Sequence, residues 1–242
     1  MRKMIGCLLL STLCGCSSMP TWLGGHKGAL SNGGTYHLTK TIPVAGDGRW
    51  DYVTFDPSTD LLYVPRQWHT QVIDPKTDTV IADIPGTMGV HGVAIAPEAG
   101  RGFTSDGENH SATIFDLKTR QVLGQTPAGK GPDAICYDPY SKAVFVFNGH
   151  GDSVTVIDAD AAPGAPARAT IALGGGPESA VADGQGHVYV NLEAEGEIDA
   201  IDTKTMKLDA TGKIAGGEEP SGLAIDRAHH YLFIGYHNKV MA

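Results

Sequence analysis

The segment DAICYDPYSKAVFVFNGHGDSVTVID, residues 133–158, carries the pattern from which the fold class can be predicted. It contains three runs rich in Val, Ile, Phe and Tyr, the residue types that favour β-strands. An Asp-Pro turn at residues 138–139 separates the first run from the second, and Asn148-Gly149 begins the polar segment before the third. Short apolar runs bounded by such turns predict a series of short antiparallel strands.

The same pattern returns along the chain from residue 36 onwards. Its first strand recurs at positions spaced 40, 42, 45 and 43 residues apart, which are Val53, Val93, Ile135, Ala180 and Leu223. The Asp that closes its third strand recurs at spacings of 42, 42 and 44 residues, at Asp74, Asp116, Asp158 and Asp202. Four strands in each repeat of about 40–45 residues are typical of β-propeller blades. The sequence therefore predicts an all-β fold, a β-propeller with four-stranded blades.

The strands LYV, VFVFN and VYVN, the ID-x-KT turns and the Gly-x-x-Pro segments resemble the YVTN/YncE-type bacterial β-propeller family. The resemblance implies seven blades. In the propeller domain predicted at residues 36–242, the sequence supplies about four and a half blades, at about 50–86, 87–127, 128–173, 174–216 and, in part, 217–242. We therefore expect the sequence to be a fragment of a longer propeller. The alternative is a closed five-bladed ring, in which residues 37–45 supply an outer strand to the last blade.

The N-terminus has the pattern of an export signal. Residues 1–15 combine a basic start with an apolar run that is too short for a transmembrane helix. The segment LCGC at residues 13–16 resembles the bacterial lipobox, which implies that Cys16 is acylated. Ser17 resembles the sorting pattern for the outer membrane, so we expect a lipid-anchored envelope protein facing the periplasm, with an ordinary secretory signal as the alternative. Residues 16–35 are rich in Gly and Ser and predict a flexible tether.

Composition excludes several other classes of protein. The chain has 32 Gly and 14 Pro among 242 residues, and because these residues interrupt helices, this content excludes a large helical bundle. Its formal net charge of -9 disfavours binding to nucleic acid, because such binding depends on Lys and Arg side chains that neutralise phosphates. Only Cys136 lies beyond the N-terminal segment, and its place inside a predicted strand indicates a buried apolar role.

Propeller geometry places the connections between strands at two opposite ends of the domain. At one end the Asp-Pro and Asp-x-Lys-Thr segments are explained by turn chemistry. At the other end, acidic and His residues precede the first strand of successive blades, and the loops after the second strand add more. We expect these side chains to surround the mouth of a central channel and to bind a ligand there. The predicted residues are Trp50, Asp51, Trp68, His69, His91, His110, Asp133, His150, Glu178 and His237.

Three functions are compatible with such a mouth. The first is non-catalytic binding of a small molecule, peptide or protein, with Trp50 and Trp68 as aromatic anchors. The second is binding of a divalent metal, for which His91, His110 and His150 are the candidate ligands. The third is metal-dependent, lactonase-like hydrolysis by the same ring of side chains. We favour the first, although simple solvation also explains each of these residues taken singly.

Overall fold

The computed structural model describes residues 37–216, 219–236 and 239–241. The chain divides into two units, residues 1–41 and residues 42–242, and all of the described strands belong to the second. The predicted signal peptide at 1–15, the acylation site Cys16, the tether at 16–35 and His237 lie outside the described residues. Within the described residues, no helix is long and apolar enough to span a membrane.

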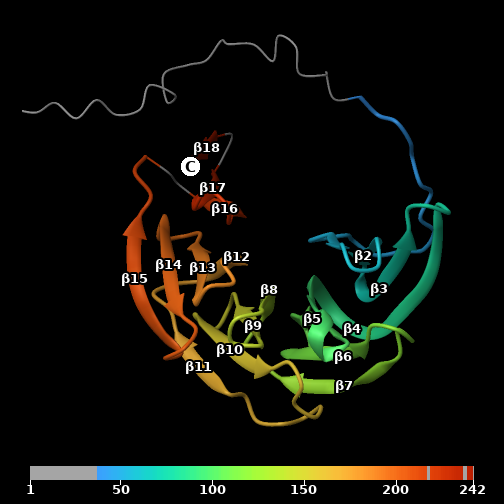
Figure 1. Cartoon of the computed structure of the whole chain (residues 1–242), viewed down its shortest axis with the longest axis horizontal. Coiled ribbons are helices and arrows are strands. Elements are labelled where there is room, and N and C mark those ends of the chain that lie inside the picture. The colour runs from blue at the N-terminus through green and yellow to red at the C-terminus, as the bar shows by residue number, and fades with distance from the viewer. Residues whose placement is uncertain (1–36, 217–218, 237–238, 242) are drawn as a thin grey trace, which may run out of the picture. The chain divides into compact units, whose positions relative to one another are not determined.

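The unit at 42–242 is all-β, and its sheets follow one another in an arc (Figure 1). The first sheet has seven strands: β1 Thr54–Asp56, β2 Leu61–Pro65, β3 Gln67–Asp74, β4 Thr79–Ala96, β5 Arg101–Asp106, β6 Ser111–Asp116 and β7 Val122–Pro127, with the short 3-10 helix η2 at Pro97–Ala99. The second has four: β8 Pro132–Asp138, β9 Ala143–Asn148, β10 Ser153–Asp158 and β11 Ala169–Ala172.

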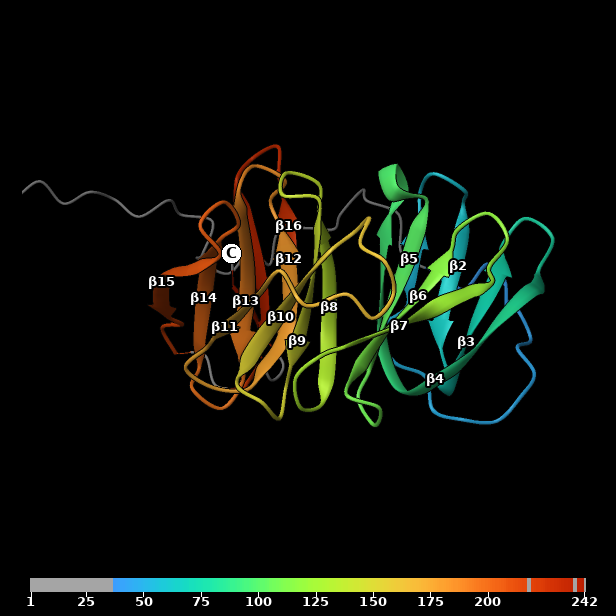
Figure 2. The same ribbon diagram turned by 90° about the horizontal axis from the view of Figure 1, so that it is seen from below.

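The third sheet contains β12 Pro177–Ala182, β13 His187–Leu192, β14 Glu197–Asp202 and β15 Lys207–Lys213. The fourth contains β16 Pro220–Asp226, β17 Tyr231–Tyr236 and β18 Lys239–Met241. Within each sheet, every strand pairs antiparallel with the next along the chain, as in the blades of a propeller. Figure 2 shows the strands running between two opposite ends of the unit, where the connections lie. The all-β prediction and its four-stranded antiparallel sheets are thus confirmed.

One predicted boundary between blades falls inside a strand. We expected a connection near residues 86–87, but β4 runs without interruption from Thr79 to Ala96 and joins two predicted blades in one sheet. Gly86 and Gly89 have positive φ values of 79° and 65°, so the chain bends there while Val90 pairs with both neighbouring strands. Residues 37–45, which the five-bladed alternative requires as a strand, form no strand, and closure of a ring is not seen.

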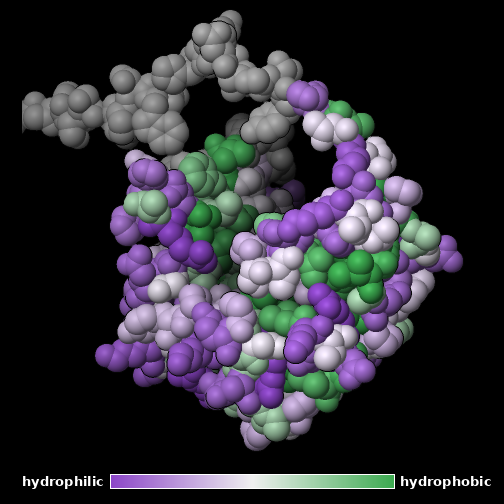
Figure 3. Space-filling view, turned by 45° about the vertical axis from the view of Figure 1, so that its right-hand side comes forward, coloured by the Kyte–Doolittle hydropathy of each residue, from purple (hydrophilic) through white to green (hydrophobic). Residues whose placement is uncertain are grey.

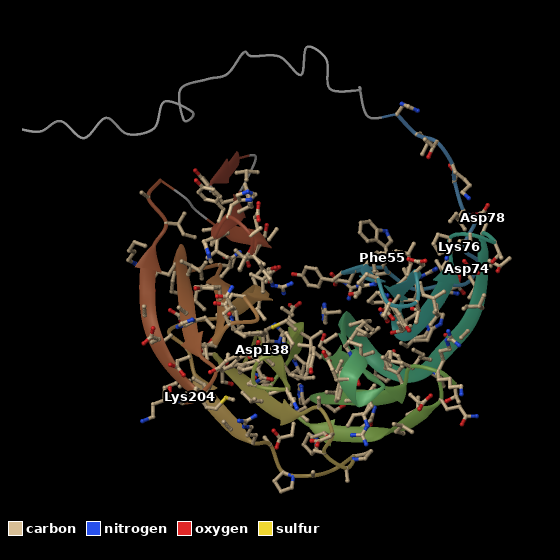
Figure 4. The ribbon with its side chains drawn as sticks, viewed as in Figure 1. Phe55, Asp74, Lys76, Asp78, Asp138 and Lys204 are labelled. Carbon is tan, nitrogen blue, oxygen red and sulfur yellow. The ribbon has the colours of Figure 1, made fainter. Side chains whose placement is uncertain are left out.

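The turns at one end follow the predicted chemistry. Third strands end at the predicted Asp residues, and the side chains of Asp74, Asp116 and Asp202 accept backbone N–H groups two or three residues later. The Asp158 carboxylate instead accepts from Arg168 Nη1 at 3.1 Å. Asp74 Oδ1 accepts from Lys76 N at 2.8 Å, and Asp202 Oδ1 accepts from Thr205 N at 2.7 Å. The labelled Asp74, Lys76 and Asp78 lie together at the turn between β3 and β4 (Figure 4). An Asp side chain that caps its own turn explains why the motif recurs.

The core lies between successive sheets. The middle of the second strand in each repeat holds an aromatic residue, and Tyr63, Phe103 and Phe145 are fully buried. Each packs against side chains of the repeat that follows. Phe103 does so in a cluster with Val144 and Val146 of the second sheet, and Tyr63 in a cluster with Val93 and Phe115 of its own sheet. Cys136 is partly buried and packs against the next such cluster, in keeping with its predicted apolar role.

Candidate functional site

A cavity of about 360 Å³ lies at the end of the unit opposite the Asp-capped turns. Its lining comes from the segments just before β8 and β12, from the bend in β4, and from the loops after β5, β9 and β13. The side chains that matter most there are Arg49, His91, Asp133, His150, Glu178 and Glu193. The cavity is therefore formed by residues from three of the sheets, and it corresponds to the predicted mouth.

Glycine pairs build the wall of this cavity. Gly107 N donates to Gly89 O at 2.8 Å, and Gly149 N donates to Gly131 O at the same distance. A Cβ atom on Gly131, whose φ is 62°, would lie 2.7 Å from the Nδ1 atom of His150. A side chain at this position would thus displace His150, so the glycine makes room for the polar group.

His91 stands between two carboxylates that come from different sheets. Its Nδ1 atom lies 2.9 Å from Asp51 Oδ2 and 3.6 Å from Asp133 Oδ1. The hydrogen bond with Asp51 raises the pKa of His91 above its usual value, and the charge of Asp133 adds to this. Burial raises the pKa of Asp133, and the charges of Asp51 and Glu193 raise it further, whereas His91 opposes the rise. The trio is a coupled acid–imidazole cluster at the edge of the cavity.

Tyr52 connects the segment before β1 with β4 and with the third sheet. Its backbone N–H donates to His91 O at 3.1 Å, and its hydroxyl donates to Glu178 Oε1 at 3.1 Å. Burial raises the pKa of Glu178 to about 7, with the negative charge of Asp133 as the next cause. Burial and the Glu178 charge likewise raise the pKa of Tyr52 far above its usual value. Tyr52 also lines a second cavity of about 150 Å³ with Gly92 and Ala134.

Five of the ten predicted residues belong to this arrangement. His91, Asp133, His150 and Glu178 line the cavity, and Asp51 holds His91. Trp50 is exposed and borders a small depression that shares Arg49 and His91 with the mouth. These positions follow from the repeat, because each precedes the first strand of a blade or begins the loop after the second strand.

The remaining predicted residues lie elsewhere. Trp68 is exposed on β3. The His69 Nδ1 atom lies 2.6 Å from Asp83 Oδ1, on the neighbouring strand β4. His110 has a positive φ of 52°, and its Nδ1 atom accepts the Gly131 N–H at 3.1 Å, which supports the loop that forms the cavity wall.

Arg49, Tyr52 and the glycine pairs were not predicted from the sequence. A signal for Tyr52 exists, because the residue after each mouth position is Tyr52, Gly92, Ala134, Ser179 and Gly222 in turn. Only one of these five side chains is large enough to cross a channel. A large residue at a position that is otherwise small indicates a side chain that fills the space left by the others.

The candidate metal ligands do not converge in the described part of the chain. Among those residues, no group of three or more His, Cys, Asp or Glu side chains is placed to hold a metal ion. Of the three candidates, His91 and His150 line the cavity and His110 supports its wall from outside. What the mouth offers is a set of carboxylates, two imidazoles and one guanidinium, arranged around a space of small-molecule size.

Comparisons with known proteins bear on the fold. No protein-family model matches the chain, and no curated protein matches it by sequence. Among solved structures, the chain is similar to hydrazine synthase of Kuenenia stuttgartiensis, with a TM-score of 0.64 and 18% sequence identity. The match covers 78% of this chain and 55% of that chain, so this chain spans about half the length of the protein it matches. At this identity the likeness shows a shared all-β fold.

Proposed function

We propose that this chain is an exported, lipid-anchored β-propeller protein of the YncE/YVTN type that binds a ligand at the mouth cavity without catalysing a reaction. The observation that carries the proposal is the convergence of Asp133, Glu178 and Glu193 on one cavity of about 360 Å³. Ligand sites are concave and combine a few convergent polar groups with perturbed pKa values. This cavity has each of those properties.

The charges in the cavity favour a ligand with a positively charged group. Four carboxylates line it, those of Glu108, Asp133, Glu178 and Glu193, whereas Arg49 is the one guanidinium there. Burial raises the pKa of Asp133 and of Glu178, and neighbouring carboxylates raise it further, which means that the charged forms of both groups are poorly stabilised by their surroundings. An ammonium or guanidinium group would supply that stabilisation. The volume suits a small amine or a single Lys or Arg side chain of a peptide.

Binding is favoured over covalent catalysis because, among the described residues that line the cavity, none is a Ser, Thr or Cys that the imidazoles and carboxylates there could activate. His91 is hydrogen-bonded to Asp51, and the Glu178 carboxylate accepts the Tyr52 hydroxyl. These bonds fix the positions of side chains from different sheets. A fixed set of charges around a cavity discriminates between ligands of opposite sign.

Isothermal titration calorimetry tests the proposal, with choline and cadaverine as cationic probes and glutarate as the anionic probe. We expect a cation to bind and glutarate not to bind. Asp133→Asn and Glu178→Gln should each weaken cation binding by tenfold or more, as expected for loss of one partly buried charge contact of about 1.4 kcal/mol. The matched control is Asp74→Asn at the opposite end, which should bind as the parent does. Equal affinity in all three variants would overturn the proposal.

The same titration separates binding from the metal-dependent alternative. Zn²⁺ is the probe, and elemental analysis of the purified protein accompanies it. Stoichiometric zinc that is lost in both His91→Ala and His150→Ala would replace the proposed function with a metal-dependent one. Retention of cation binding in zinc-free protein supports the binding function.

The membrane anchor is tested separately. Metabolic labelling with radioactive palmitate should mark the parent chain and should fail to mark Cys16→Ser. Label retained by that variant would contradict acylation at Cys16 and would leave an ordinary secretory signal as the explanation of the N-terminus.

A further inference from the structure

One position in the wall of the mouth cavity changes from glycine to glutamate between repeats. The strands β5, β9 and β13 each end five positions before the next strand begins, so the loops that follow them are equivalent. The first residue of the loop is Gly107 after β5, Gly149 after β9 and Glu193 after β13. All three line the cavity. Of these three repeats, only the last therefore places a side chain there.

The glycines show where a side chain at this position begins. A Cβ atom added to Gly149 would lie 3.5 Å from the Cβ atom of Asp133, and the matching Cβ atom in the preceding repeat would lie 3.1 Å from Nε2 of His91. In the third sheet Glu178 is equivalent to Asp133, because each follows the Pro that pairs with the end of the second strand. The Glu193 side chain therefore begins beside Glu178. Burial is the main cause of the raised pKa of Glu178, and the charge of Asp133 and then that of Glu193 raise it further, as expected for neighbouring carboxylates.

The third sheet contributes only negative charge to the cavity. Of the described lining residues that belong to this sheet or its loops, Glu178 and Glu193 are acidic, and none is His, Lys or Arg. The basic groups of the lining come from other parts of the chain, with Arg49 before β1, His91 on β4 and His150 after β9. A ligand cation therefore finds its strongest attraction between the two carboxylates of the third sheet, where no basic side chain of that sheet competes with it.

The cavity also lacks the groups that bind a cation without N–H donors. On the face drawn in Figure 3, hydrophobic residues reach the surface in patches among hydrophilic ones. In the cavity, by contrast, none of the described lining residues is Phe, Tyr or Trp, and Trp50 borders the neighbouring depression instead. Quaternary ammonium groups are recognised by the faces of aromatic rings, whereas N–H-bearing cations donate hydrogen bonds to carboxylates. The lining provides partners for the second kind of cation.

We propose that the mouth cavity selects cations that carry N–H groups, that it holds such a group between Glu178 and Glu193, and that Glu193 is the residue that determines this specificity. The inference rests on the proposed function, since it names the chemical class of the cation bound there. A primary ammonium has three N–H groups and can donate to both carboxylates at once. Glu193 adds the second acceptor at a place where the two preceding repeats have glycine and leave the space open.

Calorimetric titration with n-butylammonium and tetramethylammonium tests this specificity. The two ions are isomers with the same charge, but only the first has N–H groups. We expect the parent chain to bind n-butylammonium at least about tenfold more tightly than tetramethylammonium. Glu193→Gln should reduce this preference, because a neutral amide accepts a weaker hydrogen bond than a carboxylate does, and Glu193→Gly should reduce it further. Glu193 is exposed, so both variants should fold, and urea denaturation checks this.

The matched control is Glu98→Gln. Glu98 is an exposed residue of η2, and η2 lies at the opposite end, because Gly100 O accepts the Leu117 N–H beside the turn that Asp116 caps. This variant undergoes the same chemical change as Glu193→Gln and should keep the full preference of the parent.

The outcomes separate this inference from the proposed function. Equal affinity of the parent for the two isomers would overturn the selection of N–H-bearing cations and leave cation binding intact. A preference that survives unchanged in both Glu193 variants would show that Glu193 does not determine it. If neither isomer binds, and choline and cadaverine do not bind either, the proposed function fails together with the inference.

Discussion

The two ends of the sheets use the same chemical group, the carboxylate, in opposite ways. At the capped-turn end, Asp116 and Asp202 have pKa values below their usual range, first because backbone N–H groups of their own turns donate to them. At the mouth, Asp133 and Glu178 have raised pKa values, first because they are buried. The turn carboxylates are satisfied locally by the chain, whereas the mouth carboxylates lie among other acids.

This difference separates residues that serve folding from residues available to a ligand. A turn Asp closes its own turn within three residues, and its bonding capacity is used there. A mouth carboxylate is held by groups from distant parts of the sequence, as Glu178 is by Tyr52, 126 residues away. It follows that substitutions at the turns should change stability without changing binding, and that substitutions at the mouth should change binding and have the smaller effect on stability.

The largest effect on stability should come from Asp138, a turn carboxylate with no exposed surface. It accepts the Ser141 N–H at 3.0 Å, the Ser141 hydroxyl at 2.7 Å and the Tyr140 N–H at 3.2 Å. Asp138→Ala leaves these donors without partners, and we expect the free energy of unfolding to fall by about 3 kcal/mol. Urea denaturation measures it, and choline and cadaverine titrations should be unchanged. A loss of cation binding in this variant would contradict the expectation that substitutions at the turns leave binding at the mouth unchanged.

Asp106 should give the next largest effect, with the opposite sign. It ends β5 and is fully buried, and the Thr104 and Thr113 hydroxyls donate to it. Burial raises its pKa to about 7, so the folded state holds the proton more tightly than the unfolded state does. Stability is therefore lost as the pH rises from about 4 to about 7. Asp106→Asn should raise the free energy of unfolding at pH 8 by about 1–3 kcal/mol.

The next repeat supplies the reason to expect that Asn fits there. Asn148 holds the equivalent position, and its Nδ2 atom donates to the Ser153 and Thr155 hydroxyls, both at 3.1 Å. Ser111 and Thr113 stand at the matching places beside Asp106. The gain should shrink as the pH falls toward 4, because the Asp side chain is then neutral in both states. A gain that does not depend on pH would contradict the assignment to a buried charge.

The strands and turns could be predicted from the sequence because their causes are local. Alternating apolar residues and an Asp followed by two N–H groups act within a few positions, so the Asp at 74, 116 and 202 marked strand ends correctly. The bend in β4 could not be predicted, since Gly86 and Gly89 read as an ordinary turn. Whether such glycines end a strand depends on pairing with β3 and β5, which lie elsewhere in the sequence.

The sequence predicted which residues lie near the mouth, but it could not predict which of their side chains contact one another. The rule that a polar residue precedes each first strand gave Asp51, His91, Asp133 and Glu178. His69 was predicted by a second rule, that the loop after each second strand reaches the mouth. That rule fails for His69, which lies on β3 where the pairing with β4 shifts register between Gln67 and His69. A shift of register redirects a side chain relative to its neighbours, and no single-strand pattern reveals it.

A smaller effect is expected from pH at the mouth itself. The raised pKa of Glu178, about 7, means that the stability contributed by its protonated form is lost as the pH rises from about 4.5 to about 7. The raised pKa of His91 acts in the same direction, since its contribution is present below about 6.5 and is lost at higher pH. Glu178→Gln should remove part of this slope, on the order of 1 kcal/mol after screening by solvent. Urea denaturation at pH 5 and pH 8 measures it, and an unchanged slope would contradict the assignment.

The smallest effect should come from the ion pair at the β3–β4 turn. Lys76 Nζ lies 2.7 Å from Asp60 Oδ2, but both side chains are largely in solvent, at 71% and 50% exposure. Exposed pairs gain little, because water screens the attraction and ordering a long side chain costs entropy. Lys76→Ala should therefore lower the melting temperature by less than about 1 °C, and added salt should abolish the difference. Differential scanning calorimetry at two salt concentrations checks this. If Lys76→Ala cost as much as Asp138→Ala, exposed charge pairing rather than bonds from the turn backbone would stabilise this end, and the contrast between the two ends would need another explanation.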